Sequence, residues 1–339
     1  MRIGIDALDN FVNQLLIKAG LTESDAASMT NVYRRATLRG IGHHDIYDLP
    51  KRLHALSEGL VKIKPEITMV GGFNAIENYN GDNGLGEICT SFIMNRSKAL
   101  ADSYGIGFCT IYNSNHFLSA SPYVEQLAED GYFCMIWSST QPVMGWPNSG
   151  DKLIGNNPMG FGTPGKSNSI LLDISMAYSS IGGLHTTNKE GRKISKHTAV
   201  DVNGNYTDNP LEALHGASLP IGEHKGFGLA LLGELLTSVL SGGVMIEEKS
   251  KLKQLFGEYI HAQTMITIKT DVFMSEEQYK QRVNQLQEFI KGKESNVRIP
   301  GERSLFKKAE LEQKGVWING ELREELNVWA ERFHLSARI

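Results

Sequence analysis

The stretch GFGTPGKSNSILLDIS, Gly160 to Ser175, decides between the fold classes that the chain could adopt. Its first eight residues match the phosphate-binding pattern G-x-x-x-x-G-K-[ST], and the same residues contain G-x-G-x-x-G. Both patterns bind phosphate at the N-terminus of a helix that follows directly. Here the glycine-rich part is followed by NSILLDIS, whose run Ile170–Leu172 is typical of a strand. The stretch therefore predicts two strands joined by a tight loop.

Two further points argue against a phosphate cradle at this stretch. Pro164 has no backbone N–H and removes one of the donors that such a cradle needs. The G-x-G-x-x-G pattern also needs a helix directly after it, so a Rossmann dinucleotide site is not predicted here either. A nucleotide triphosphatase that uses Gly160–Ser167 stays an alternative, which ATP turnover and the substitution Lys166→Ala would reveal.

The composition is that of an ordinary soluble protein. Its 339 residues are 41% hydrophobic and 21% charged, and the net charge is −4. This charge gives no basic surface for nucleic acid. We expect neither a signal peptide, because MRIGIDALDNF lacks an apolar core, nor a membrane span. Three cysteines without a CxxC pair suit buried, reduced thiols, so we expect a cytoplasmic protein.

Along the chain, helical and strand patterns alternate, which favours an α/β fold. Three helical segments open the sequence, the second with Thr22 and Asp25 at capping-box spacing, and an apolar helix follows Lys225. The last 65 or so residues return to charged amphipathic helices. Strands are expected at 66–72, 75–81, 105–113, 132–139, 169–175 and 258–270, and helices at 5–20, 22–40, 50–60, 86–104, 120–130, 226–242 and 275–292.

Two histidine-bearing segments are the candidates for chemistry. RGIGHHDIYDLP, Arg39 to Pro50, lies between two helices, and NSNHF, Asn113 to Phe117, follows an apolar strand. Working groups of α/β enzymes commonly lie in loops after buried strands. Histidine transfers protons near neutral pH, although either ring could instead be satisfied by backbone hydrogen bonds.

In these segments and several others the chain resembles the type-2 malate/L-lactate dehydrogenases, and within that family the 2,3-diketo-L-gulonate reductases. The resemblance runs nearly end to end, through N-x-N-H-F, IGNNPMGFGTP, LLDISMA, LPIGEHKGFGLALLGELL and VRIPGE. It implies a non-Rossmann α/β dinucleotide-binding domain at 66–272. It also implies a helical domain formed by both chain ends, 1–65 and 273–339, and a homodimer.

The resemblance also implies the roles of individual residues. His44 matches the proton donor of the diketogulonate reductases, and His116 matches the acid/base histidine of ureidoglycolate dehydrogenases, so both are expected at the catalytic centre. No metal is required, and the cluster around His43 and Asp45 lacks helical H-x-x-x-H spacing. The expected substrate contacts are His43, Asp48 and Thr140. The expected cofactor contacts are Asn156, Leu172, Asp173, Ile174, Ser175, Met176, His224, Lys225, Gly301 and Glu302.

The reaction implied is hydride transfer between nicotinamide and the carbonyl carbon of a small ketone or 2-hydroxy acid-like molecule, with a histidine moving the proton. NAD(H) is favoured because the closer relatives use it. NADP(H) stays an alternative, because His185, Lys189 and Arg192 could meet a 2′-phosphate. A family member that only binds its ligand is a third alternative.

The first histidine segment departs from the family pattern R-G-x-x-S-H-G-x-x-R-x-P. His43 replaces the serine, Asp45 the glycine, and Asp48 the arginine that is expected to bind a substrate carboxylate. An aspartate there would repel a carboxylate by about 1–3 kcal/mol when partly desolvated. The hypothesis is that the substrate lacks that carboxylate, unless Lys51 or Arg52 restores a positive group.

Overall fold

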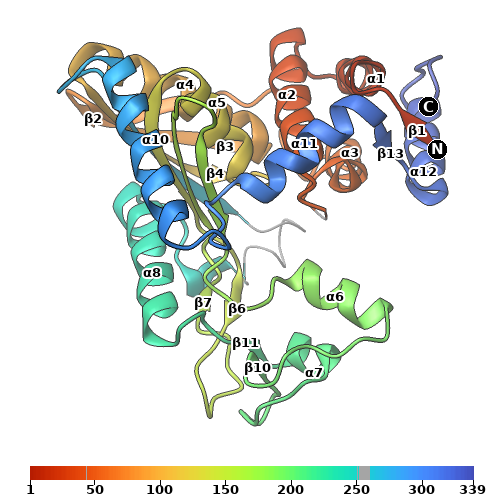
Figure 1. Ribbon diagram of the computed structural model, residues 1–339. Coiled ribbons are helices and arrows are strands. Elements are labelled where there is room, and N and C mark those ends of the chain that lie inside the picture. Colours follow the sequence, from red (N-terminus) through yellow and green to blue (C-terminus); the bar gives the residue numbers. More distant parts are fainter. Residues whose placement is uncertain (43, 250, 252–259) are drawn as a thin grey trace.

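The computed structural model describes residues 1–42, 44–249, 251 and 260–339. The two chain ends meet in one helical layer, where β1 (Arg2–Ile3) pairs antiparallel with β13 (Val316–Trp317) (Figure 1). The amino group of Met1 also donates to the carbonyl of Ile318, at 3.0 Å. The helices of this layer are α1 (Ile5–Lys18), α2 (Glu23–Arg39), α3 (Leu49–Ser57), α11 (Glu302–Lys314) and α12 (Gly320–Arg332). A helical part built from both ends, as expected, is therefore present.

Local signals in the sequence explain the bounds of α2. The hydroxyl of Thr22 accepts the backbone N–H of Asp25 at 3.1 Å, which satisfies a free donor of the first turn. The helix ends at Gly40, whose φ of 64° is left-handed and favours glycine. Capping from Thr22 to Asp25, predicted from spacing, is confirmed. The left-handed turn at Gly40 leads the chain into the first histidine segment.

Seven strands form the main sheet, in the order β2-β3-β4-β12-β5-β8-β9. Only β3 and β4 are parallel neighbours, and every other pair is antiparallel. A Rossmann sheet is mostly parallel, so the expected non-Rossmann α/β class is confirmed. The strands are β2 (Thr68–Phe73), β3 (Ile76–Gly84), β4 (Ile106–Ser114), β5 (Tyr132–Ser138), β8 (Met159–Thr163), β9 (Ile170–Ile174) and β12 (His261–Lys269).

Helices cover both faces of this sheet, as the contacts of two threonines on opposite faces of β12 show. The hydroxyl of Thr267 hydrogen-bonds Ser97 of α4 (Gly86–Tyr104), at 2.7 Å. The hydroxyl of Thr264 donates to Leu236 in the π-helical turn η2 (Leu235–Val239), which continues α8 (His224–Glu234). Because successive strand residues point to opposite faces, α4 and α8 lie on opposite sides. α5 (Ser121–Glu129) packs beside α4, and α10 (Glu276–Lys293) contacts β8 through Tyr279 and Thr163.

The glycine-rich stretch forms the hairpin of β8 and β9, with Gly160 opposite Asp173. Lys166 lies in the connecting loop, half exposed and 3.9 Å from Glu277. No helix follows Ser167 within this described stretch, where β9 begins at Ile170. The prediction of two strands joined by a loop is confirmed, and the phosphate-binding patterns here are coincidental.

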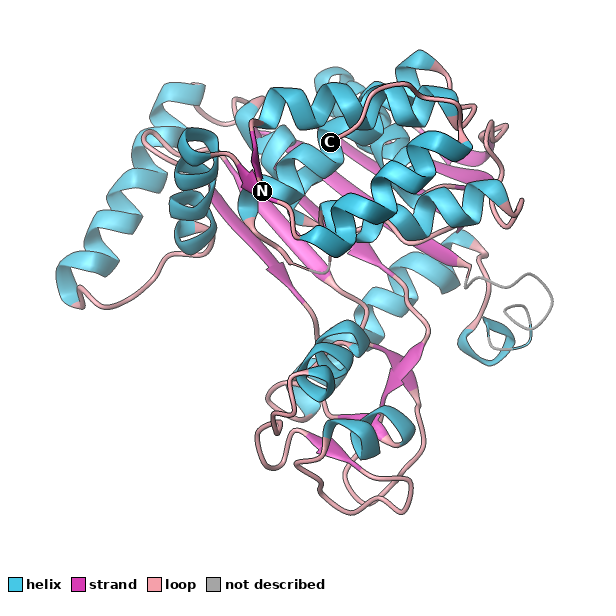
Figure 2. Ribbon diagram, turned by 90° about the vertical axis from the view of Figure 1, so that its right-hand side faces the viewer, coloured by secondary structure: helices cyan, strands magenta, loops and turns pink. Residues whose placement is uncertain are grey.

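A small lobe extends from the main body (Figure 2). Its four-stranded sheet has the order β10-β11-β6-β7. The lobe contains β6 (Pro142–Met144), β7 (Ile154–Gly155), β10 (Ala199–Val200), β11 (Ala217–Ser218), α6 (Ile181–Lys189) and α7 (Pro210–His215).

One continuous hydrophobic core joins the helical layer to the sheet, from Leu8 in α1 through Ile111 in β4 to Leu326 in α12. All three cysteines are free and buried. Among the described residues, no helix combines the length and apolarity that crossing a membrane requires. The domain boundaries at 65 and 272 stay a prediction.

Candidate active site

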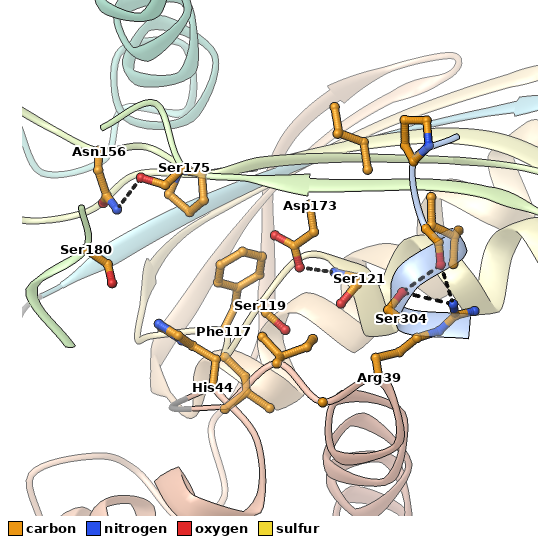
Figure 3. Close-up of a pocket in the computed structure, with 18 of the residues that line it drawn as sticks. Arg39, His44, Phe117, Ser119, Ser121, Asn156, Asp173, Ser175, Ser180 and Ser304 are labelled. Atoms are coloured by element: carbon orange, nitrogen blue, oxygen red, sulfur yellow. Dashed lines mark hydrogen bonds between the residues drawn. The ribbon is translucent and has the colours of Figure 1, made fainter. Parts of the chain in front are cut away.

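A cleft of about 460 Å³ lies where the helical layer, the β8–β9 hairpin and the end of β4 meet. In the view of Figure 3, His44, Asn156 and Ser175 lie toward one end, and Arg39 and Ser304 lie toward the other. Its lining combines backbone and side chains from five parts of the chain. The lining residues are Arg39–Ile41, His44, His116–Ser119, Ser121, Thr140, Asn156, Pro158, Leu171–Asp173, Ser175, Ser180, Pro300, Gly301, Arg303 and Ser304.

His44 reaches the cleft from the loop between α2 and the short 3-10 helix η1 (Ile46–Asp48). Asp45 holds this loop in shape, because its carboxylate accepts the backbone N–H of Tyr47 at 3.0 Å and of Gly42 at 3.1 Å. Burial of Asp45 raises its pKa to about 7, although these two hydrogen bonds lower it. The aspartate that replaces the family glycine is thus a structural cap beside His44.

His116 meets His44 from the segment that follows β4. The two rings stack with centroids 5.0 Å apart and planes inclined by 20°. The ring of His261 in β12 stands edge-on to His116, at 5.8 Å. Nδ1 of His261 donates to the carbonyl of Ser139, at 2.7 Å, and burial lowers the pKa of His261 to about 3. The structure brings together both histidines that the sequence singled out.

Arg52 of α3 lies behind His116 and links it to two carboxylates. Its guanidinium lies 2.8 Å from Nδ1 of His116, 2.9 Å from Glu87 and 3.0 Å from Asp48. Lys51 also contacts Asp48, at 3.0 Å. Burial raises the pKa of Asp48, but Arg52 and Lys51 outweigh it and hold that pKa below its usual value.

The position of Asp48 bears on the hypothesis drawn from its replacement of arginine. The residue is 5% exposed, and it is not among the residues that line the cleft. Its charge is paired with two cations, so Asp48 does not face a substrate carboxylate as an unpaired negative charge. Sequence reasoning named Lys51 and Arg52 as groups that could restore positive charge, and both contact Asp48.

Five of the expected cofactor residues line the cleft: Asn156, Leu172, Asp173, Ser175 and Gly301. Thr140, an expected substrate residue, also lines it. Its hydroxyl donates to Oδ1 of Asn156 at 2.8 Å, and Nδ2 of Asn156 donates to the hydroxyl of Ser175 at 2.9 Å. The carboxylate of Asp173 accepts the backbone N–H of Ser121, at 2.8 Å. These bonds fix the orientation of the polar wall opposite the histidines.

The other expected contacts lie elsewhere. Met176 is fully buried in a small core with Met144, and Ile174 packs against the same core. His224 and Lys225 are exposed at the start of α8. Glu302 accepts the backbone N–H of Ile299 at 3.1 Å and pairs with Lys291. His43 lies outside the described residues.

The cleft also contains residues that sequence reasoning missed. Arg39 donates to Glu125 at 2.6 Å and to Ser304 at 3.1 Å, so it joins α2, α5 and α11 at one wall. Arg303 is exposed at the same wall. Arg39 opens the quoted segment RGIGHHDIYDLP and Arg303 directly follows VRIPGE, and that proximity was the available signal. No signal in the sequence pointed to Ser119 and Ser121, which follow NSNHF.

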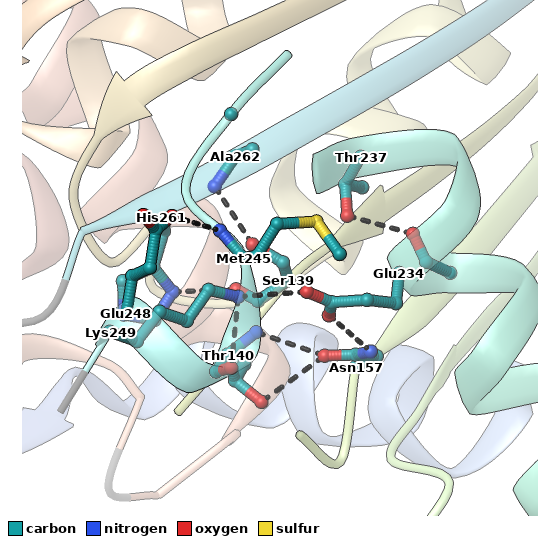
Figure 4. Close-up of polar contacts among 12 residues, drawn as sticks. Ser139, Thr140, Asn157, Glu234, Thr237, Met245, Glu248, Lys249, His261 and Ala262 are labelled. Carbon is teal, nitrogen blue, oxygen red and sulfur yellow. Dashed lines mark hydrogen bonds and ion pairs between the residues drawn. The ribbon is translucent and has the colours of Figure 1, made fainter. Parts of the chain in front are cut away.

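A buried polar network supports the wall that carries Thr140 (Figure 4). Nζ of Lys249 donates to the carbonyl of Thr140 at 3.2 Å and to Glu234 at 3.3 Å. Glu234 accepts from Nδ2 of Asn157 at 2.9 Å, and Oδ1 of Asn157 accepts the N–H of Thr140 at 2.9 Å. Lys249 is 1% exposed, and burial lowers its pKa despite the attraction of Glu234. The network holds Thr140 and Asn157 in one arrangement.

Comparison with known proteins places this architecture in a family. The family model described as malate/L-lactate dehydrogenase matches residues 3–327. The chain is 28% identical to malate dehydrogenase of Pyrococcus horikoshii over 345 residues, which covers 98% of this chain and 95% of that protein. It is 25% identical to 2,3-diketo-L-gulonate reductase of Pasteurella multocida over 332 residues, which covers 96% and 99%.

A third relative is known in both sequence and structure. L-sulfolactate dehydrogenase of Methanocaldococcus jannaschii is 31% identical over 300 residues, which covers 85% of each chain. Its solved structure superposes with a TM-score of 0.88 and covers 99% of this chain and 98% of that one, at 28% identity. The family consists of dehydrogenases and reductases that act on CH–OH and C=O groups, which implies a nicotinamide cofactor. The chain belongs to the malate/L-lactate dehydrogenase family.

Proposed function

We propose that the protein catalyses hydride transfer between NADH and a small 2-oxo or 2-hydroxy acid-like substrate, with the carbonyl oxygen bound at His44 and His116. The observation that carries this proposal is the stacked histidine pair, which faces a wall of amide and hydroxyl groups across one cleft. When bound, nicotinamide supplies or accepts the hydride. The histidines hold or move the proton on the substrate oxygen as charge changes there.

The polar wall of the cleft fits a ligand with several hydrogen-bonding groups. Asn156 and Ser175 are proposed to bind the carboxamide or ribose, and Gly301 to let a ligand approach the start of α11 closely. Ser119 lines the cleft and is 7% exposed, and its buried hydroxyl makes no hydrogen bond with any described residue. Because buried hydroxyls normally have partners, this orphan group supports a bound ligand.

NADH is proposed over NADPH because the resemblance to diketogulonate reductases favours it. The basic residues that could meet a 2′-phosphate lie on and after α6. Arg192 among them is already paired with Glu190 of the same segment, in an exposed contact. Separate fluorescence titrations of NADH and NADPH decide between the two, and a tenfold preference for NADPH would reverse this assignment.

A substrate that lacks the usual carboxylate is the second candidate, and the engagement of Arg52 favours it. Arg52 does not take the place of the family arginine as a free cation for a substrate carboxylate, because its guanidinium already contacts Asp48, Glu87 and His116. Simple ketones and polyols would then compete with 2-oxo acids. Near-normal turnover of a 2-oxo acid, unchanged in Asp48→Ala, would remove this candidate.

The decisive experiment measures NADH oxidation with a panel of 2-oxo acids and ketones, and NAD⁺ reduction with polyols. His44→Gln is the test variant, and His54→Gln is its matched control, because His54 packs against Trp329 in the helical layer. Turnover that is lost in His44→Gln and kept in His54→Gln would support the proposal. Binding of NADH without turnover of any substrate would instead favour the non-catalytic alternative.

We also infer a homodimer in the cytoplasm. One face of α8 and η2 exposes apolar side chains, among them Leu232 (41%), Leu235 (47%) and Val239 (47%). Such a continuous apolar face normally contacts another surface, and a second copy is the occupant that the family resemblance favours. The buried free thiols suit a reducing compartment. Light scattering that gives twice the chain mass, and half of that value for Leu235→Glu, tests the dimer.

A further inference from the structure

Two donors converge on one ring nitrogen of His116. Nη2 of Arg52 lies 2.8 Å from Nδ1, and the backbone N of Leu118 lies 3.1 Å from the same atom. A guanidinium and a backbone amide can only donate. Nδ1 of His116 therefore carries no proton, and in the neutral ring the proton is on Nε2.

Carboxylates on both sides keep Arg52 in place. Glu87 of α4 is fully buried and accepts from Nε of Arg52 at 2.9 Å, while Asp48 forms an ion pair with Nη2 at 3.0 Å. Although burial lowers the pKa of Arg52, these carboxylates raise it well above its usual value. A guanidinium remains charged in proteins. Nε of Arg52 thus engages Glu87, and Nη2 lies between Asp48 and His116.

The second donor depends on an unusual backbone conformation. Leu118 has a φ of +75°, in the left-handed region that leucine rarely adopts, and its side chain is 1% exposed. Such a residue costs about 1–2 kcal/mol in backbone strain. Strain of this kind persists where the surrounding structure imposes it, commonly at functional sites. Here it turns the N–H of Leu118 onto Nδ1 of His116.

The charges around His116 favour its neutral form. From α3 it faces Arg52 and Lys51, from the α2–η1 loop His44, and from β12 His261. Desolvation and Arg52, followed by the other three groups, lower the pKa of His116 well below its usual value. Asp48 and Glu87 contact Arg52 rather than the imidazole, so they offset the guanidinium without stabilising an imidazolium.

We propose that Arg52 is a positioning residue that holds His116 as a neutral imidazole able to donate only from Nε2. Resting on the proposed function, this assigns different tasks to the stacked pair. As the carbonyl carbon gains the hydride, His44 transfers its proton to the oxygen, and His116 keeps its own proton and stabilises the developing negative charge through a hydrogen bond. In the oxidative direction His44 takes the proton back.

The test records the ring nitrogens of the full chain labelled with ¹⁵N-histidine, without cofactor or substrate. Long-range ¹H–¹⁵N spectra report the tautomer and charge of each ring, and His116→Gln identifies the signals of His116. The expected result is a neutral Nε2–H ring throughout pH 5.5–8. In Arg52→Met combined with Asp48→Asn, which removes one charge of each sign, the ring should titrate at a pH about one unit higher or more. Lys51→Met is the matched control, because Lys51 contacts the same Asp48 but not His116.

Two outcomes would overturn the assignment: a proton on Nδ1 in the unaltered protein, or a titration of His116 that is the same with and without Arg52. Circular dichroism confirms that each variant is folded, and Asp48→Asn alone shows the effect of the aspartate. Because these spectra need no turnover, failure of the dehydrogenase proposal would leave this result intact. Absence of NADH oxidation, conversely, would not change the tautomer.

Discussion

The imidazole of His44 stacks on that of His116, with the ring centroids 5.0 Å apart. The two residues come from different layers, since His44 follows the helices of the N-terminal end and His116 follows strand β4 of the sheet. The cleft exists where these layers meet, and both rings line it. The contact therefore depends on the packing of the helical layer against the sheet.

His44→Gln and His116→Gln should each lower kcat by about 10²–10⁴-fold, because proton transfer and hydrogen bonding at one oxygen are lost. In the double variant kcat should fall by much less than the product of the two single losses, since both residues act on the same atom. Steady-state NADH oxidation measures this. Effects that multiply would show that the two rings serve separate steps.

Loss of the cation in the buried pair of Lys249 and Glu234 should destabilise the fold. Lys249→Met leaves Glu234, 3% exposed, without its cation, which should lower the free energy of unfolding by about 3–5 kcal/mol. Adding Glu234→Gln should restore part of that loss. Urea unfolding measures both, with Lys280→Met, in an exposed pair with Glu276, as a control that should change stability by about 0.5 kcal/mol or less. Equal effects of Lys249→Met and Lys280→Met would refute the argument.

Asp45 should make stability depend on pH. Its pKa is about 7 in the fold and near 3.8 when unfolded, so the folded state binds the proton more tightly. This contribution is complete below pH 4 and is lost as pH rises through 7, with a slope of at most about 1.4 kcal/mol per pH unit. Unfolding titrations from pH 4 to 8 should show the decline, and Asp45→Asn should remove it. If Asp45→Asn keeps the full dependence of the unfolding free energy on pH, other groups cause it.

Gly301→Ala should weaken both the fold and NADH binding. The φ of Gly301 is +94°, and an added Cβ would lie 3.2 Å from the backbone of Leu171 in the cleft. We expect a loss of about 1–2 kcal/mol from backbone strain. Gly292→Ala in α10, where a Cβ meets nothing within 4 Å, should instead stabilise by up to about 1 kcal/mol. Thermal unfolding and NADH fluorescence report the two effects, and an unchanged NADH affinity would place the cofactor away from Gly301.

Lys166→Ala should leave stability and NADH binding unchanged within about 0.5 kcal/mol. The lysine side chain is 58% exposed, and its only described ion-pair contact is 3.9 Å away, at Glu277. The unaltered protein should release no phosphate from ATP. Phosphate release that disappears in Lys166→Ala would revive the nucleotide triphosphatase alternative.

Much of the local structure follows from neighbouring residues alone. The helix over 86–104 is confirmed with the same bounds, and the Thr22 cap and the β8–β9 hairpin form as expected. Helix caps, glycine stops and β-branched or apolar runs act over a few residues, so the sequence displays them. The motifs shared with the family likewise mark both histidines.

The partners of Asp48 could not be assigned in the same way. Sequence spacing placed Lys51 and Arg52 near it on one helix turn, but Glu87 and His116 reach Arg52 from α4 and from the end of β4. Expected cofactor residues on one strand also separated: Leu172 and Asp173 of β9 line the cleft, while Ile174 packs on a core.

The sequence by itself thus determined most helices and strands of the main body, though not those of the small lobe. With the family resemblance it also indicated the non-Rossmann class and the two histidines, since capping, periodicity and motif order are properties of short segments. Only the tertiary structure decided that Asp48 is paired rather than free, that Arg52 points at His116, and that Lys249 lies buried under Thr140. These are contacts between segments distant in the chain. Their energies depend on burial and on which charges packing brings within about 3 Å, and no local pattern encodes either.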